Sequence, residues 1–168
     1  MIHILPATSL AHFETISRLA HEIWHEHYIK IISVEQIEYM LEKYNSVSHI
    51  TERANNGALF FYMTYNDKPV GYLAMEKHLD YLYISKLYVM KESRGKGIAK
   101  TVIDFVVSMA QDKGKPMVKL HVNKYNYGAI GFYGNMGFVN TESVITDIGN
   151  GFIMDDYLMV KHLKLKGI

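Results

Sequence analysis

A short basic segment that contains two glycines stands between an apolar run and a helical pattern. Residues 87–100 read Leu-Tyr-Val-Met-Lys-Glu-Ser-Arg-Gly-Lys-Gly-Ile-Ala-Lys. The N–H groups at the start of a helix lack partners within the helix and carry partial positive charge. Glycine lets backbone amides approach a phosphate closely, and Arg94, Lys96 and Lys100 add positive charge. The segment is therefore predicted to bind a phosphate group.

Three kinds of phosphate loop can be compared with this segment. A Walker A loop needs Ser or Thr after its lysine, but Lys96 is followed by Gly97. A dinucleotide fingerprint needs Gly or Ala at the place that Lys100 occupies. The coenzyme A pyrophosphate pattern, Gln/Arg-x-x-Gly-x-Gly/Ala, is satisfied in full by Arg94, Gly97 and Ala99. An ordinary strand-to-helix turn is the alternative, because so short a motif also occurs without a ligand.

A second motif begins about thirty residues later. Residues 126–138 read Asn-Tyr-Gly-Ala-Ile-Gly-Phe-Tyr-Gly-Asn-Met-Gly-Phe. This segment resembles a block of the GNAT superfamily of N-acetyltransferases, Asn-x-x-Ala-Ile-x-Phe-Tyr-x-x-x-Gly-Phe, at every named position. The loop at residues 94–99 is similar to the CoA-binding block of the same superfamily, and the two blocks stand in the family's order. Together they lie within residues 81–138, about a third of the chain.

The resemblance implies an enzyme that moves an acetyl group directly from acetyl-CoA, its co-substrate, to a primary amine of a small molecule or peptide, without a metal. Asn126 and Tyr133 are two helical turns apart and face one side of a helix. Asn126 would bind the cofactor, and Tyr133 would be the catalytic acid that protonates the departing thiolate. The cofactor-binding residues implied are Leu87, Tyr88, Val89, Arg94, Gly95, Lys96, Gly97, Ile98, Ala99, Asn126 and Tyr133.

Backbone groups of residues 87–89 would pair with pantetheine as an added strand does, and the Val89 N–H would stabilise the oxyanion. These three residues can also serve as strand core. Tyr133 on its own would be read as a core tyrosine with a satisfied hydroxyl.

The general base is not evident. Many relatives carry Glu on the strand before the loop, but residues 81–89 contain no acid. Glu76, His78 and His121 are candidates, and Ser85 or Tyr83 could order a water molecule instead. A catalytically silent module that binds or senses acyl-CoA is therefore kept as the alternative function.

The family resemblance implies an acceptor pocket built partly by the first two helices and the last strands. The candidate substrate residues are Trp24, Tyr28, Glu76 and Asp155. Trp24 and Tyr28 also fit the apolar stripe of a helix, which usually packs in the core. Asp155 and Asp156 point to opposite faces of a strand, and a solvated strand end is the alternative for both.

Residues 21–25, His-Glu-Ile-Trp-His, match the helix motif of zinc proteases. No glycine-bearing extension supplies a third ligand, so a polar helix face is favoured over a metal site.

Composition limits the remaining classes of function. The chain has 168 residues, a net charge of +1 and no cysteine. These values predict one domain over residues 1–168, no nucleic-acid or membrane partner, and no thiolate chemistry. No signal-peptide or transmembrane pattern is evident, so a cytoplasmic location is expected. A homodimer stays open, since dimers are common among GNAT proteins.

Hydrophobic periodicity predicts the order β-α-α-β-β-β-α-β-α-β-β. The order mixes helix pairs with hairpins, so neither an all-parallel nor an all-antiparallel sheet fits. The resemblance implies an α+β (mixed α/β) three-layer fold, in which helices flank a central, mixed, splayed and mostly antiparallel sheet of about seven strands. The predicted strands are 2–5, 58–65, 69–77, 81–90, 117–122, 138–146 and 152–162, and the predicted helices are 13–28, 37–44, 98–110 and 128–136, with a short helical turn expected over residues 46–56.

Overall fold

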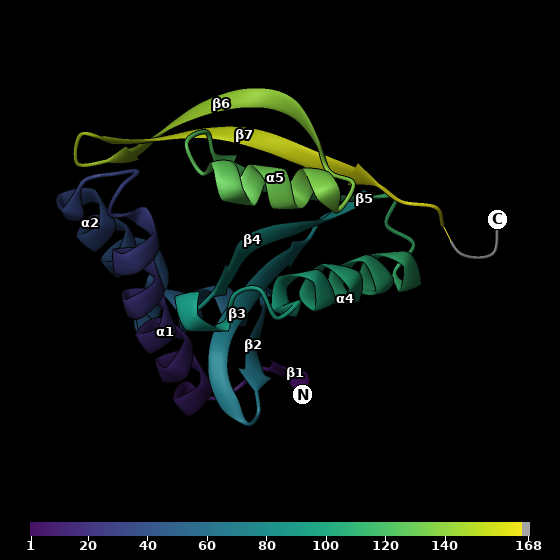
Figure 1. Cartoon of the computed structure of the whole chain (residues 1–168), viewed down its shortest axis with the longest axis horizontal. Helices are drawn as coiled ribbons and strands as arrows, with labels where there is room; N and C mark the ends of the chain where they lie inside the picture. The colour runs from purple at the N-terminus through teal and green to yellow at the C-terminus, as the bar shows by residue number, and fades with distance from the viewer. Residues whose placement is uncertain (166–168) are drawn as a thin grey trace. The chain divides into compact units, whose positions relative to one another are not determined.

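The computed structural model describes residues 1–165 and contains every predicted strand and helix in the predicted sequence, with two further helical elements (Figure 1). Two details were not foreseen. Residues 46–56, expected to add one short turn, form a helix of 9 residues, and a short 3-10 helix precedes the glycine loop. In chain order the elements are β1 (Ile2–Pro6), α1 (Leu10–Tyr28), α2 (Val34–Asn45), α3 (Val47–Asn55), β2 (Leu59–Tyr65), β3 (Lys68–Lys77), β4 (Tyr81–Val89), η1 (Lys91–Ser93), α4 (Ile98–Asp112), β5 (Met117–Asn123), α5 (Tyr127–Asn135), β6 (Val139–Gly149) and β7 (Phe152–His162).

The strands form a 7-stranded sheet in the order β1-β2-β3-β4-β5-β7-β6. The β1–β2, β2–β3, β5–β7 and β6–β7 pairs are antiparallel, and β4–β5 is parallel. The predicted mixed sheet and α+β class are therefore confirmed. No helix among residues 1–165 combines the length and the hydropathy that crossing a bilayer requires.

Backbone contacts divide the chain into two compact units. The first unit consists of residues 1–76 and 86–102, and the second of residues 77–85 together with residues from 103 onward. A single domain over residues 1–168 stays a prediction.

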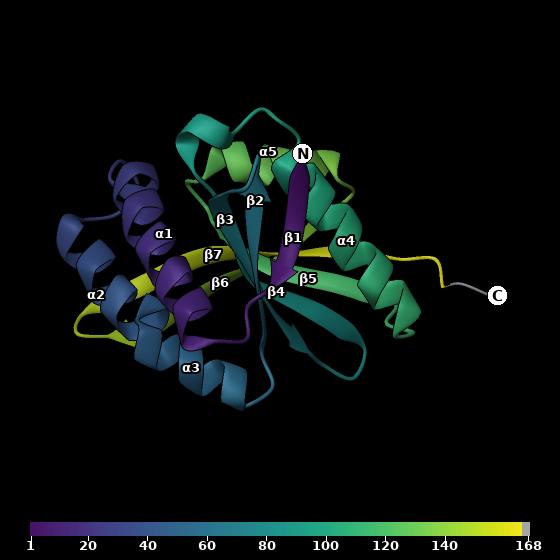
Figure 2. The same ribbon diagram turned by 90° about the horizontal axis from the view of Figure 1, so that it is seen from below.

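The first unit joins the β1–β2–β3 ladder with three helices. α1, α2 and α3 pack against one another, as Figure 2 shows. The apolar stripe of α1 is buried, with Ile16 at 0% and Leu19 at 2% exposure, because its residues recur at helical spacing. Ser9 and Ser33 cap α1 and α2 by accepting hydrogen bonds from the backbone N–H groups of His12 and Gln36.

The second unit contains the parallel β4–β5 pair and the antiparallel β5–β7–β6 ladder. β5 alternates between buried Val118, Leu120 and Val122 on one face and partly exposed residues on the other. α5 runs beneath β7 in Figure 1, and the Lys161 ammonium of β7 donates to the Met136 carbonyl at the end of α5 (2.7 Å). This bond ties the end of α5 to the sheet.

Gly71 on β3 is predicted to tolerate no side chain. A Cβ atom there would lie 2.4 Å from the Tyr88 carbonyl oxygen and 3.3 Å from the Val89 Cα atom, both of which belong to the backbone of β4. Gly71→Ala should lower the free energy of unfolding by about 1–3 kcal/mol or more, because the two strands must move apart. Thermal unfolding measures the change.

Gly134→Ala is the matched control, since a Cβ atom there meets nothing within 4 Å and the residue lies inside α5. It should stabilise the protein by about 0.5–1 kcal/mol. Equal effects of the two substitutions would contradict the crowding at Gly71.

Candidate functional site

The glycine loop of the first unit places two left-handed residues directly before α4. Gly95 has φ +81° and Gly97 has φ +78°, values that side chains disfavour. α4 begins at Ile98, and its first backbone bond runs from the Thr101 N–H to the Gly97 carbonyl (3.0 Å). The N–H groups of residues 98–100 therefore have no carbonyl partner within the helix. A Cβ atom at either glycine would meet nothing within 4 Å, so the loop is open around them.

Arg94 fixes the loop to neighbouring elements of the first unit. Its Nε donates to the Val89 carbonyl (3.0 Å), and its two terminal nitrogens each donate to one carboxylate oxygen of Glu26 on α1 (2.9 Å and 2.9 Å). These hydrogen bonds from Arg94 lower the pKa of Glu26. The structure thus gives Arg94 a positioning role, and direct contact with phosphate stays a prediction. Sequence reasoning missed Glu26, because no local signal links residues 68 positions apart.

Lys96 is exposed, and its ammonium lies 4.7 Å from the centre of the Tyr65 ring. Its predicted contact with the cofactor, like those of the other loop residues, stays a prediction.

Tyr88 at the end of β4 belongs to an aromatic cluster with Trp24 and Tyr28 of α1. The Tyr88 ring centre lies 5.4 Å from that of Trp24, and the hydroxyls of Tyr28 and Tyr88 are 3.0 Å apart. Trp24 Nε1 donates to the hydroxyl of Tyr72 (2.9 Å), which in turn donates to the Asn45 side chain (3.3 Å). Trp24 and Tyr28 are buried, at 5% and 9% exposure. Trp24 and Tyr28 therefore pack in the core, as expected for the apolar stripe of a helix. Their contact with a substrate stays a prediction.

Two charged groups lie close to this part of β4. Glu76, predicted as a base or substrate residue, forms an ion pair with Arg53 (2.7 Å). Lys86, which sequence reasoning did not single out, donates to the Tyr44 carbonyl at the end of α2. Burial lowers the pKa of Lys86 to about 7, and the Arg53 charge acts in the same direction. The signal in the sequence was a single lysine within a strand of mostly apolar and aromatic residues.

In the second unit, Asn126 lies at the N-terminal end of α5 and Tyr133 lies within α5, and the two residues are 7% and 8% exposed. Asn126 stands at the N-cap position, but its side chain makes no capping bond. Nor does its amide form any other side-chain hydrogen bond within residues 1–165. The Tyr133 ring packs against Phe132 and Phe138, with ring centres 5.3 Å and 5.6 Å away. Asn126 is buried overall, but its amide atoms are not among the fully enclosed polar atoms without a partner in residues 1–165, so the amide can still bond to a ligand.

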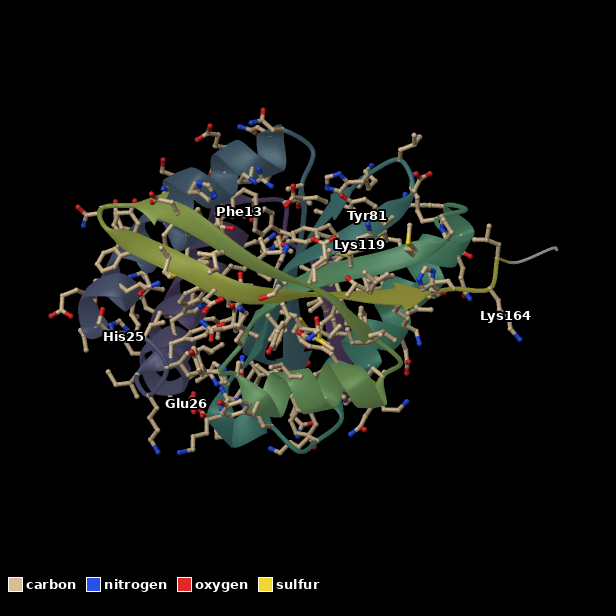
Figure 3. The ribbon with its side chains drawn as sticks, turned by 90° about the horizontal axis from the view of Figure 1, so that it is seen from above. Phe13, His25, Glu26, Tyr81, Lys119 and Lys164 are labelled. Atoms are coloured by element: carbon tan, nitrogen blue, oxygen red, sulfur yellow. The ribbon has the colours of Figure 1, made fainter. Side chains whose placement is uncertain are left out.

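The other candidates for the base in the second unit lie on β4, β5 and the segment before β4. The Tyr83 hydroxyl and His121 Nδ1 are 2.5 Å apart, and burial lowers the pKa of His121. His78 stacks on Tyr81, with ring centres 4.5 Å apart. The Lys119 ammonium lies 4.3 Å from the centre of the same Tyr81 ring, and Figure 3 shows these two residues side by side.

The adjacent acids of β7 have different surroundings. Asp155 forms an ion pair with Lys124 (2.7 Å). Asp156 is buried, at 8% exposure, and burial raises its pKa to about 6, helped by the charge of Asp155. Sequence reasoning favoured Asp155 as a substrate residue, which stays a prediction, but Asp156 is the less solvated group.

The two histidines of the zinc-like motif hydrogen-bond to the helix itself. The Nδ1 atoms of His21 and His25 lie 2.9 Å and 2.7 Å from the carbonyls of Ser17 and His21, and His25 Nε2 contacts Glu38 of α2. Figure 3 labels His25 and its neighbour Glu26. In the described part of the chain, no three His, Asp or Glu side chains come together as a metal site would require.

Glu26→Gln should lower stability by about 1 kcal/mol or less at neutral pH, because both side chains of the pair with Arg94 are about a third exposed. The pKa of Glu26 is lowered in the folded state, so this stability is present above the unfolded pKa and is lost as pH falls through the folded pKa. The difference in melting temperature between variant and wild type should therefore vanish in acid. Glu22→Gln, at an exposed position of the same helix, is the control. A difference that persists in acid would contradict the pair.

Comparison with known proteins agrees with this geometry. The family model described as "Acetyltransferase (GNAT) family" matches residues 16–138. The peptidyl-lysine N-acetyltransferase YjaB of Salmonella typhimurium is 32% identical over 96 residues, 56% of this chain and 59% of that protein. The spermidine N(1)-acetyltransferase of Thermoplasma acidophilum is 28% identical over 152 residues, covering 88% and 92% of the two chains. This chain covers 39% to 59% of the length of four curated relatives that it matches, YjaB included.

Among solved structures, the PaiA N-acetyltransferase of Thermoplasma acidophilum in complex with coenzyme A has a TM-score of 0.80 at 23% identity. The alignment covers 97% of this chain and 99% of that one, so the two share a fold. The family model covers well over half of the sequence, including both the glycine loop and the segment that begins at Asn126. This chain belongs to the acetyltransferase (GNAT) family.

Proposed function

We propose that the protein transfers an acetyl group from acetyl-CoA to a primary amine of a small molecule or peptide. The observation that carries this proposal is the start of α4, where two left-handed glycines with open space around them precede backbone amides that have no partner within the helix. The pyrophosphate of CoA is the anion that the family resemblance implies. The relatives named as spermidine and peptidyl-lysine acetyltransferases support a primary alkylamine as the acceptor.

Asn126 supports the same proposal from the second unit. Its side-chain amide has no hydrogen-bond partner among the described residues, and pantetheine carries amide groups that could bond to it. Leu87, Tyr88 and Val89 would offer backbone groups to the same arm. The residues present therefore fit acetyl-CoA, and no metal is needed for the reaction.

In the proposed reaction the amine nitrogen bonds to the acetyl carbon and the carbon–sulfur bond breaks. The Tyr133 phenol gives its proton to the departing thiolate and regains one from solvent, while the amine gives up its protons to a base or to water. Tyr133 suits this role, because a tyrosine with a pKa near 10 is protonated at neutral pH and thiolate is a modest base. The chain must also hold the two reactants in contact.

The missing acid on β4 favours the second candidate, a module that binds acyl-CoA without turnover. Thiol release from acetyl-CoA across a panel that includes spermidine and a lysine peptide separates the two. Turnover with any amine supports the enzyme, whereas tight binding of acetyl-CoA without turnover supports the silent module. The predicted cytoplasmic location and homodimer stay predictions.

Tyr133→Phe should lower kcat by about 100-fold or more with little change in the Kd of acetyl-CoA, because it removes only the proton donor. Steady-state kinetics and calorimetry give the two values. Tyr127→Phe changes an exposed tyrosine of the same helix, at 73% exposure, and should leave both unchanged. Full activity of Tyr133→Phe would exclude this residue as the acid.

Gly97→Ala should weaken CoA binding by about tenfold, because a left-handed alanine costs roughly 1–2 kcal/mol and the loop relaxes away from its open form. Gly57→Ala introduces the same kind of strain at φ +100°, outside the loop and with open space around it. It should lower the melting temperature without changing the Kd of CoA. Equal Kd values for the two variants would contradict a role for the Gly97 turn.

A further inference from the structure

Asp156 is a buried acid on β7, the middle strand of the β5–β7–β6 ladder, at the point where β5 ends. It stands opposite Asn123 of β5 and Val144 of β6, and its exposure is 8%. Isolated carboxylates rarely occupy such positions, because burial removes the water that stabilises their charge. The residue therefore requires an explanation beyond packing.

No group of the described chain neutralises this carboxylate by direct contact. The nearby Lys124 forms its ion pair with Asp155 instead, at 2.7 Å. Within residues 1–165, Asp156 forms neither a side-chain hydrogen bond nor an ion pair. Burial accordingly raises its pKa to about 6, and the negative charge of Asp155 adds to the rise while Lys124 opposes it. The group is still mostly ionised at neutral pH, so an arriving cation would stabilise it.

The strand register places Asp156 between Asn123 of β5 and Val144 of β6, on a face that carries apolar side chains such as Leu158 as well as polar ones. Side chains alternate across β5, and Val118, Leu120 and Val122 occupy the buried face. Asp156 pairs with Asn123, so it lies on the opposite face, which also carries His121 on β5 and Glu142 on β6. His121 is in turn bonded to Tyr83 of β4. This face belongs to the same unit as Asn126 and Tyr133.

We propose that Asp156 receives the ammonium group of the acceptor amine and takes one proton from it, as the base that β4 lacks. The inference rests on the proposed acetyl transfer. One proton passes from the ammonium to the Asp156 carboxylate, which leaves a neutral amine whose lone pair bonds to the acetyl carbon as the carbon–sulfur bond breaks. The new amide nitrogen loses its second proton to water, the thiolate takes one from Tyr133, and Asp156 and Tyr133 then return to their starting forms by exchange with solvent.

This role defines the substrate class. An alkylamine with a pKa near 10.4 is about one part in a thousand neutral near pH 7.4, so it depends on a base. An arylamine is uncharged at neutral pH and needs no such group. Asp156 therefore selects primary amines that arrive as cations, of which spermidine and a lysine peptide are convenient probes.

The test compares wild type, Asp156→Asn and Asp147→Asn with spermidine and with an arylamine over a range of pH. Asp156→Asn should lower kcat/KM for spermidine by about 100-fold and lose the acidic limb that wild type shows near pH 6. With the arylamine it should lose less than about threefold. Asp147→Asn, which changes an exposed acid of β6, should keep both the activity and the acidic limb. The Kd of acetyl-CoA should be unchanged in all three.

Two further measurements distinguish a catalytic role of Asp156 from a structural one. Asn has the shape of Asp, so Asp156→Asn should fold. It should melt at or above the wild-type temperature at pH 8, because an acid whose pKa is raised on folding costs stability once pH exceeds the folded pKa. In the wild type, spermidine should lower the pKa of the Asp156 carboxyl measured by carbon NMR, which is a readout of ammonium binding that needs no turnover.

Activity of Asp156→Asn within threefold of wild type on spermidine, or an unchanged acidic limb, would overturn this inference and leave the acetyltransferase proposal standing. A wild type that binds acetyl-CoA but acetylates no amine would overturn the proposed function and the inference with it.

Discussion

The backbone amides at the start of α4 impose the constraint on which the rest of the proposed site depends. A helix leaves its first N–H groups without internal partners, and here two glycines with φ near +80° turn the chain directly before these groups, with open space around both glycines. Only residues without a side chain adopt this turn without strain. Arg94 holds the turn by bonding the Val89 carbonyl behind it and Glu26 on α1, so the loop is fixed before any ligand arrives. A pre-formed loop binds without the cost of ordering it.

The aromatic cluster beside β4 stabilises the strand that leads into this loop. Trp24, Tyr72 and Asn45 form a buried chain of hydrogen bonds, and Tyr28 reaches Tyr88 through a hydroxyl pair. A buried polar network whose members are satisfied holds one arrangement of its strands and helices. In the second unit, by contrast, Asn126 and Asp156 are buried without hydrogen-bond partners among the described residues. Buried polar groups that lower stability in this way are typical of sites that bind a ligand.

The sequence predicted the order and type of the elements, because helical and strand periodicities are local signals. The glycine loop could also be predicted from the sequence, because Gly95 and Gly97 mark a turn and Ile98 begins an apolar helical pattern. Contacts between residues far apart in the chain could not be predicted. Nothing in the sequence near Arg94 indicates its ion pair with Glu26, and nothing near Lys86 indicates its hydrogen bond to the end of α2. Alternation along β7 predicted that Asp155 and Asp156 point to opposite faces of the sheet. Only the structure shows that Asp156 is the buried acid, at 8% exposure, and which residues of β5 and β6 stand opposite it. The site residues themselves stay predictions until a ligand is bound.

The most direct test of this account is an amide NMR titration with coenzyme A and, in parallel, with pantetheine, which lacks the pyrophosphate. Coenzyme A should shift the backbone amides of Gly97, Ile98 and Ala99 together with the side-chain amide of Asn126. Pantetheine should shift the Asn126 signal and leave the loop amides in place. If saturating coenzyme A leaves the amides at the start of α4 unmoved, the pyrophosphate does not bind there and the proposed cofactor site is wrong.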